Sequence, residues 1–151
     1  MSLEKAYLLQ GISEQTLQRI VEISREEAHP PGAFLFHAGD PADYLYILGA
    51  GRVRLCVGEK GQVANVVSEP GEVIGWSSMV EQEEYTSSAE CILPVTVTKI
   101  AKSALLQLLE HDPASGLIFF RHLSRIIGQR LVACYKATLS VHGKPNSRSY
   151  G

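Results

Sequence analysis

The spacing of hydrophobic residues predicts a helix near the start of the chain. Leu17, Ile20 and Val21 recur at steps of three and four and fall on one helical face. Ser13 precedes them as a good N-cap, with Glu14 in the first turn. We therefore expect a first helix over residues 13–23, with its apolar face docked on the rest of the domain.

From residue 30 onward the helical period gives way to short runs rich in β-branched and aromatic residues, separated by Gly and Pro turns. In one run Val53, Leu55 and Val57 alternate with Arg52 and Arg54, as in a strand with one buried face. The two arginines are expected in solvent, the alternative being that one reaches a pocket. The predicted strands are residues 33–36, 44–48, 52–57, 63–67, 85–91 and 95–100. Such a series favours a double-sheet jelly roll with flanking helices.

A helical period returns after residue 101, with helices predicted from near Lys102 and Pro113. The last helix has a sharp apolar seam at steps of three and four. The seam consists of Phe120, Leu123, Ile127, Leu131 and Cys134. It suits either a dimer contact or packing against the protein's own barrel, and periodicity alone does not choose between them.

The segment 71–89, GEVIGWSSMVEQEEYTSSA, carries the most specific chemistry. Gly71 and Gly75 allow two sharp turns and a close approach of the backbone. Ser77 and Ser78 are interpreted as the start of a short helix whose N–H groups and hydroxyls point outward. Such an end attracts phosphates or carboxylates.

This segment and the elements around it resemble the cyclic nucleotide-binding domain, the sensor half of Crp/Fnr regulators and of the regulatory subunits of cyclic-nucleotide-dependent kinases. The resemblance covers nearly the whole chain. It implies one domain over residues 1–140, with the first helix at 13–23, a jelly-roll barrel at 30–101 and a helix pair at 102–140, followed by a polar tail at 141–151.

In ligand-binding members, a glutamate after the counterpart of Gly75 binds the ribose, and an arginine ten residues later pairs with the cyclic phosphate. Here these positions hold Trp76 and Thr86. A charge-assisted arginine–phosphate contact contributes roughly 1.5–3 kcal/mol, which a threonine hydroxyl does not match. The resemblance therefore implies poor binding of cyclic AMP in the ordinary way. It leaves a cyclic nucleotide or another small anionic ligand as the candidate.

The candidate ligand-binding residues come from the segment 71–89 and from the last helix. Trp76 either stacks on a bound ring or fills the pocket itself. Arg130 and Tyr135 either meet the ligand at the pocket mouth or lie on the surface. The full set is Gly75, Trp76, Ser77, Ser78, Thr86, Ser87, Arg130 and Tyr135.

Composition narrows the classes of protein. The 151 residues, 45% of them hydrophobic, suffice for one domain. A net charge of −2 without a basic cluster argues against direct nucleic-acid binding, and no apolar run approaches the ~18 residues of a membrane helix. We expect a cytoplasmic protein. Cys56, Cys91 and Cys134 are widely spaced, which favours reduced structural thiols over a disulfide or metal site.

Catalysis finds little support in the sequence. A metal enzyme on a similar barrel would need a His-x-His pair followed by a glutamate and a later histidine. The five histidines stand apart, and neither a nucleophile elbow nor a phosphate loop occurs. They are His29, His37, His111, His122 and His142.

The residues after Leu139 are too few for the helix-turn-helix of a Crp-type regulator. Either the chain is a stand-alone sensor that contacts another protein, which its Met1 and polar tail favour, or it is cut from a longer one. The predicted function is a non-catalytic regulatory sensor that signals through its last helix and dimerises along it. The alternative is a ligand-free dimerisation or protein-docking module on the same fold.

Overall fold

Two antiparallel four-stranded sheets form the body of the domain in the computed structural model, which describes residues 2–142. One sheet has the strand order β1-β8-β3-β6 and the other β2-β7-β4-β5. The strands are β1 (Ser24–His29), β2 (Phe34–Phe36), β3 (Tyr44–Ala50), β4 (Val53–Val57), β5 (Gln62–Val67), β6 (Val73–Ile74), β7 (Ser88–Cys91) and β8 (Val95–Ala101). The predicted jelly roll with flanking helices is confirmed.

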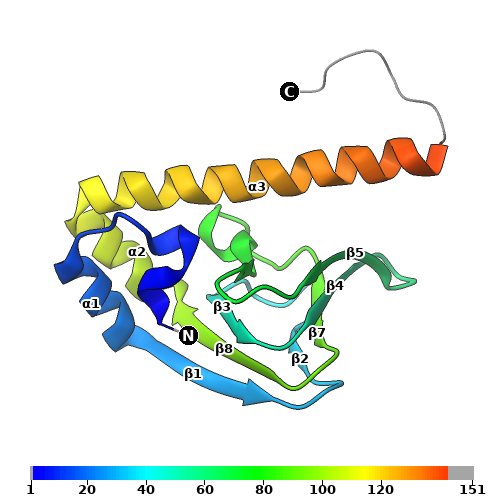
Figure 1. Ribbon diagram of the computed structural model, residues 1–151, viewed down its shortest axis with the longest axis horizontal. Helices are drawn as coiled ribbons and strands as arrows, with labels where there is room; N and C mark the ends of the chain where they lie inside the picture. Colours follow the sequence, from blue (N-terminus) through cyan, green and yellow to red (C-terminus); the bar gives the residue numbers. More distant parts are fainter. Residues whose placement is uncertain (1, 143–151) are drawn as a thin grey trace.

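The helices α1 and α2 lie at one end of the two sheets, and α3 starts there and runs along the length of the domain (Figure 1). They are α1 (Glu14–Ile23), α2 (Lys102–His111) and the 30-residue α3 (Pro113–His142). Short 3₁₀ turns are η1 (Leu3–Lys5), η2 (Tyr7–Leu9) and η3 (Trp76–Met79). The predicted polar tail lies outside the described residues from position 143, while positions 141 and 142 belong to α3.

Two groups of buried residues make up the core. One fills the space between the sheets and includes Phe36, Tyr46 and Val53. The other joins the helices and the N-terminal turns to the first sheet and includes Ile20, Leu45 and Leu105. Trp76 and several residues of α3 pack against the edge of this second group. The second group therefore connects η3, in the segment singled out by the sequence, to the last helix.

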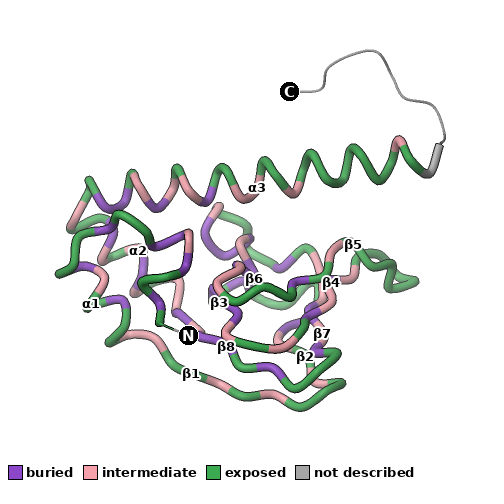
Figure 2. The backbone as a smooth tube through the Cα atoms, in the orientation of Figure 1, coloured by how far each residue is buried: buried purple, intermediate pink, exposed green. Residues whose placement is uncertain are grey.

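Helix α3 has two halves with different surroundings (Figure 2). In the first half, residues 113–127, Phe119 and Leu123 are fully buried in the helical core, and Phe120 and Ile127 pack partly against it. In the second half, residues 128–142, Leu131 is 50% exposed. The predicted apolar seam thus does not pack on one surface throughout. Its N-terminal residues, Phe120, Leu123 and Ile127, pack on the protein's own domain, and Leu131 does not.

Two strands were missed by the sequence prediction. The six residues of β1 read SREEAH, which are mostly polar, and this edge strand pairs only with β8. Strand β6 has only two residues, too few for a recognisable period. The predicted strand at 85–91 begins three residues late, at Ser88, because Tyr85 instead exchanges backbone hydrogen bonds with the loop at Gly39 and Asp40.

Candidate functional site

Gly75 occupies a position that only glycine fits. Its φ of +81° lies in the left-handed region, which disfavours other residues. A Cβ here would lie 3.2 Å from Tyr85 Cε1, 3.3 Å from Phe36 Cε1 and 3.3 Å from the Tyr44 carbonyl oxygen. The turn before Trp76 is therefore packed tightly against the residues that fix the other end of the segment.

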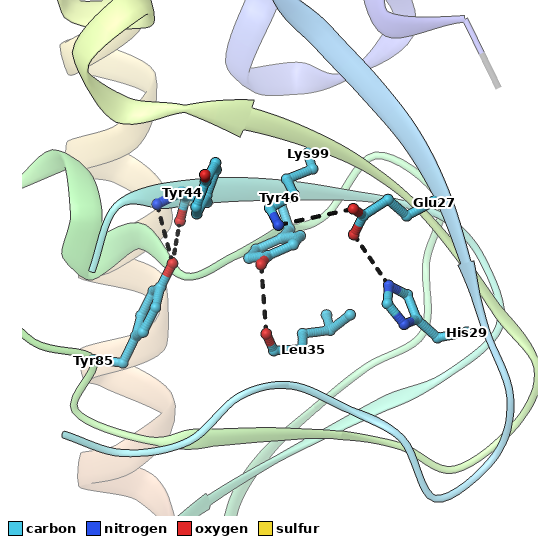
Figure 3. A network of polar contacts seen from close by, with 7 residues as sticks. All are labelled: Glu27, His29, Leu35, Tyr44, Tyr46, Tyr85 and Lys99. Atoms are coloured by element: carbon cyan, nitrogen blue, oxygen red, sulfur yellow. Dashed lines mark hydrogen bonds and ion pairs between the residues drawn. The ribbon is translucent and has the colours of Figure 1, made fainter. Parts of the chain in front are cut away.

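Tyr85 anchors that other end to β3 (Figure 3). Its hydroxyl donates to the Tyr44 carbonyl at 2.6 Å and accepts from the Tyr44 N–H at 3.2 Å. The Tyr85 ring stacks on Phe36 with centroids 3.7 Å apart. Burial raises the pKa of the Tyr85 phenol to about 12, which extends the pH range over which its hydroxyl can donate this hydrogen bond. These contacts fix the position of the backbone immediately before Thr86 and Ser87.

The same close-up shows a polar group on the neighbouring sheet (Figure 3). Lys99 Nζ lies 4.1 Å from the centre of the Tyr44 ring and 3.8 Å from Glu27 Oε2. Glu27 Oε1 also lies 3.2 Å from His29 Nε2. Tyr46 donates to the Leu35 carbonyl at 3.4 Å. The Glu27 and Lys99 contacts link β1, β3 and β8, and the Tyr46 hydrogen bond joins β3 to β2 of the other sheet. None of these residues lines the cavity between the second sheet and α3.

Ser77 and Ser78 are not exposed at an open helix end as the sequence suggested. Ser77 is 4% exposed and Ser78 is completely buried within the four-residue turn η3. The Ser78 hydroxyl donates to the Gly75 carbonyl at 2.8 Å, which uses it inside the turn. The Ser77 hydroxyl lies 3.4 Å from that of Thr86 and so links the two ends of the segment. Both serines are thus buried residues whose hydroxyls make contacts within the segment.

A cavity of about 490 Å³ opens between the second sheet, the segment 76–87 and the second half of α3. Trp76, Thr86 and Ser87 line it from the segment, and Arg130 lines it from the helix. The remaining lining residues are Leu55, Val57, Gln62, Val63, Ala64, Asn65, Ala133, Cys134, Ala137 and Thr138. Trp76 is half-buried against the helical core and forms part of the wall without filling the space.

Arg130 is the one charged residue among the described residues that line this cavity. One of its Nη atoms donates to the carbonyl of Val73 in β6. Burial lowers the pKa of its guanidinium, and the charge of Glu72 opposes that shift. Its Nη1 is buried without a hydrogen-bond partner in the described part of the chain. An arginine in this position carries an incompletely compensated positive charge.

The other arginines that the sequence pointed to lie away from the cavity. Arg54 forms an ion pair with Glu90 of β7, directly across the sheet, and Arg52 is exposed. Neither replaces the arginine absent at Thr86. Tyr135 lines a separate hollow on another side of α3, together with Leu131, Val132 and Lys136. The structure therefore places Arg130, but not Tyr135, beside Trp76 and Thr86.

Several cavity residues escaped the sequence interpretation. Gln62 and Asn65 come from β5, and Ala137 and Thr138 from the last turns of α3. No motif marks them, because they become neighbours only when α3 crosses the open edge of the second sheet. Among residues 2–142, no group of three His, Cys, Asp or Glu side chains is arranged to hold a metal ion. Within the described residues no helix has the length and apolar character needed to cross a membrane.

Comparison with known proteins gives several relatives of low sequence identity, two of which are described here. An uncharacterized NTE family protein of Mycobacterium tuberculosis is 26% identical over 128 residues, which are 85% of this chain and 22% of that protein. The cyclic AMP receptor protein of Thermus thermophilus is 22% identical over 126 residues, which are 82% of this chain and 56% of that protein. The chain thus spans about a fifth of the first relative and about half of the second.

A solved structure described as a putative cyclic nucleotide-binding protein from Geobacter metallireducens superposes with a TM-score of 0.74 and 28% identity. The match covers 87% of this chain and 98% of that one. The family model for the cyclic nucleotide-binding domain matches residues 26–112, more than half of the chain and most of its two sheets. The chain therefore belongs to the cyclic nucleotide-binding domain family.

Proposed function

We propose that this domain is a non-catalytic regulatory sensor that binds a small ligand in the cavity beside Trp76 and reports through the second half of α3. The observation that carries the proposal is the composition of the cavity wall. The segment 76–87, the second sheet and α3 all contribute to one space of about 490 Å³. A ligand there would touch the fixed barrel and the helix together.

The proposal extends to the kind of ligand. The positions of the ribose-binding glutamate and phosphate-binding arginine hold Trp76 and Thr86, and both line the cavity. Without those charges, ordinary cyclic AMP binding loses its two main polar contacts. The remaining wall combines hydroxyls, amides and apolar side chains, which suits a smaller ligand or one with fewer polar groups. A cyclic nucleotide and a non-nucleotide anion are the two ligand classes to compare.

We also propose that the domain forms a homodimer through α3. Leu131 is 50% exposed and Val132 is 41% exposed on the second half of the helix, where they lie next to one another. Apolar side chains exposed in this way on a helix favour pairing with another helix. Movement of α3 on ligand binding would then change the contact between two copies.

A thermal-shift screen tests the sensor. Ligand binding to the folded state adds stability by RT ln(1 + [L]/Kd), about 2.7 kcal/mol at 100 times Kd. The panel is cyclic AMP, cyclic GMP, linear nucleotides and small apolar carboxylates and phosphates. An upward shift with one class and none with the others supports the sensor and names its ligand class. A flat response across the panel contradicts it.

The second candidate function is a ligand-free docking or dimerisation module. The replacement of both charged contacts by Trp76 and Thr86 favours it, since a module that no longer binds a nucleotide has no need of them. Such a module would keep the α3 contact and respond to no small molecule. Self-association that is retained in sedimentation experiments, with a flat thermal-shift response, is the result that favours this function over the sensor.

A further inference from the structure

Among the described residues, the cavity between the second sheet and α3 is lined by one cation, Arg130 of the helix. The lining residues from the second sheet and from the segment 76–87 are all uncharged. Thr86 stands at the position of the family's phosphate-binding arginine and carries no charge. Arg54, on the lining strand β4, is paired with Glu90. An anion inside this space would therefore meet a positive charge only at Arg130.

Arg130 is also incompletely satisfied where it stands. Burial disfavours its charged form, its Nη1 has no partner in the described part of the chain, and one backbone carbonyl, that of Val73, accepts from the group. The charge of the Glu72 carboxylate favours the charged guanidinium, but no ion pair joins the two groups in the described part of the chain. Glu72 Oε2 instead accepts from the N–H groups of Ser68 and Glu69. A buried guanidinium with five donors gains most from an anionic acceptor.

Resting on the proposed function, we propose that the ligand of this cavity is an apolar monoanion whose negative group is bound by Arg130 of α3. The guanidinium turns from the Val73 carbonyl toward the cavity, and its covered Nη1 gains an acceptor. The apolar body of the ligand packs between Trp76 and the side chains of Leu55 and Val63. A single cation calls for a single negative charge, whether a carboxylate, a sulfonate or a phosphodiester carries it.

In this proposal the anion is bound by a residue of the last helix, Arg130, and not by a loop of the barrel. The anion would bond directly to α3, so the helix itself would detect the charge of the ligand. The bond that Arg130 now makes to Val73 ties α3 to β6, which immediately precedes Gly75. Exchange of the Val73 carbonyl for the ligand would release that tie at the moment of binding. Ligand charge and helix position would thereby be coupled through one side chain.

Two dyes that share an apolar body test the proposal. Anilinonaphthalene sulfonate is a monoanion, and phenylnaphthylamine is its uncharged parent. Trp76 is the one tryptophan of the chain and lines the cavity, so quenching of its emission reports a dye bound to the domain, and the Arg130 variants described next assign the binding to the cavity. We expect the wild-type protein to bind the anionic dye at least tenfold more tightly than the neutral one.

Three variants assign the preference to the side chain. Arg130→Gln keeps an amide donor and removes the charge, and it should weaken the anionic dye roughly 10- to 100-fold while leaving the neutral dye unchanged. Arg130→Lys should recover part of the loss. Arg121→Gln, an exposed arginine on the same helix that does not line this cavity, should behave as wild type for both dyes. Thermal unfolding of each variant verifies that it folds.

The outcomes separate this inference from the proposed function. If neither dye quenches Trp76, the cavity binds no apolar monoanion of this kind and the inference is wrong, while the thermal-shift panel decides the sensor proposal separately. If both dyes bind equally to the wild type, or Arg130→Gln weakens both alike, the cavity binds ligands and the role of Arg130 in anion recognition is wrong. Equal binding in the wild type decides the matter even if the Arg130 variants do not fold.

Discussion

The two halves of helix α3 are one continuous element with opposite relations to the domain. In the first half, Phe119 and Leu123 are fully buried in the helical core. In the second half, Leu131 and Val132 are exposed, while Ala133 and Thr138 border a cavity. Core burial fixes the first half, and the second half has few contacts that resist movement. We therefore call residues 113–127 the anchor and residues 128–142 the arm, which the core does not hold in place.

The largest effect is expected from breaking the anchor. Phe119→Ala removes a fully buried ring that meets Phe120 edge to face, with centroids 5.1 Å apart, and should lower the free energy of unfolding by about 3–5 kcal/mol. Leu131→Ala in the arm should cost less than about 1 kcal/mol. Urea unfolding at low protein concentration measures both. Equal losses would remove the distinction between the two halves.

The next effect concerns self-association of the arm. Leu131→Glu places a charge in the proposed helix contact between two copies and should weaken dimerisation at least tenfold without changing the fold of the monomer. Sedimentation velocity over a range of concentrations measures this. Leu117→Glu, a similarly exposed leucine in the first half, is the matched control and should leave association unchanged. Weakening by the control alone would move the contact to the other half.

A smaller effect should come from the polar junction where α3 begins. Asp112 accepts hydrogen bonds from the hydroxyls of Ser13, Thr16 and Ser115 at 2.6–2.7 Å. These bonds hold the pKa of Asp112 well below its usual range. Since the folded-state pKa lies below the unfolded value of about 3.9, the stabilisation is complete above that value and is lost as the pH falls below it.

Asp112→Asn should therefore lower the urea midpoint at pH 7, and the gap to wild type should narrow as the pH falls below about 4. Unfolding curves of both proteins over this pH range measure the effect. A gap that stays constant with pH would mean that the carboxylate charge does not contribute to the junction.

The smallest effect on stability is expected from restoring the two charges in the segment 76–87. Trp76→Glu combined with Thr86→Arg changes residues that are half-buried or exposed, so the fold should persist. Cyclic AMP binding should appear, because the segment would again offer partners for the ribose and the phosphate. Calorimetry measures the affinity, and the single variants serve as controls. Absence of any gain would show that the geometry of the cavity has diverged along with its charges.

The fold was predictable because its signals are local. The apolar spacing of α1 and of α3 and the β-branched runs of β3, β4 and β8 identify themselves in the sequence. Strand β1 was not predictable, since its polar residues take an extended form only through pairing with β8. For β1, pairing with a neighbouring strand determines a backbone conformation that the local sequence does not determine.

The site was predictable in part. The resemblance of the segment to the cyclic nucleotide-binding domain implies Trp76, Thr86 and Ser87, and the match of the last helix to the same family implies Arg130. The burial of Ser78 was not predictable, because its hydroxyl turns back to Gly75 only in the tight 3₁₀ turn. The isolation of Arg130 also depends on the whole fold. Arg54 is paired with Glu90, and the Glu72 carboxylate accepts from the N–H groups of Ser68 and Glu69 and not from the Arg130 guanidinium.

The most direct measurement is hydrogen–deuterium exchange of α3 with and without saturating anilinonaphthalene sulfonate, at constant protein concentration and with binding followed by Trp76 emission. Ligand in the cavity should slow exchange in residues 128–142 and leave residues 113–127 unchanged, because only the second half borders the cavity. Saturated binding with unchanged exchange in 128–142, or a change confined to 113–127, would contradict the account of α3 as the element that reports the ligand.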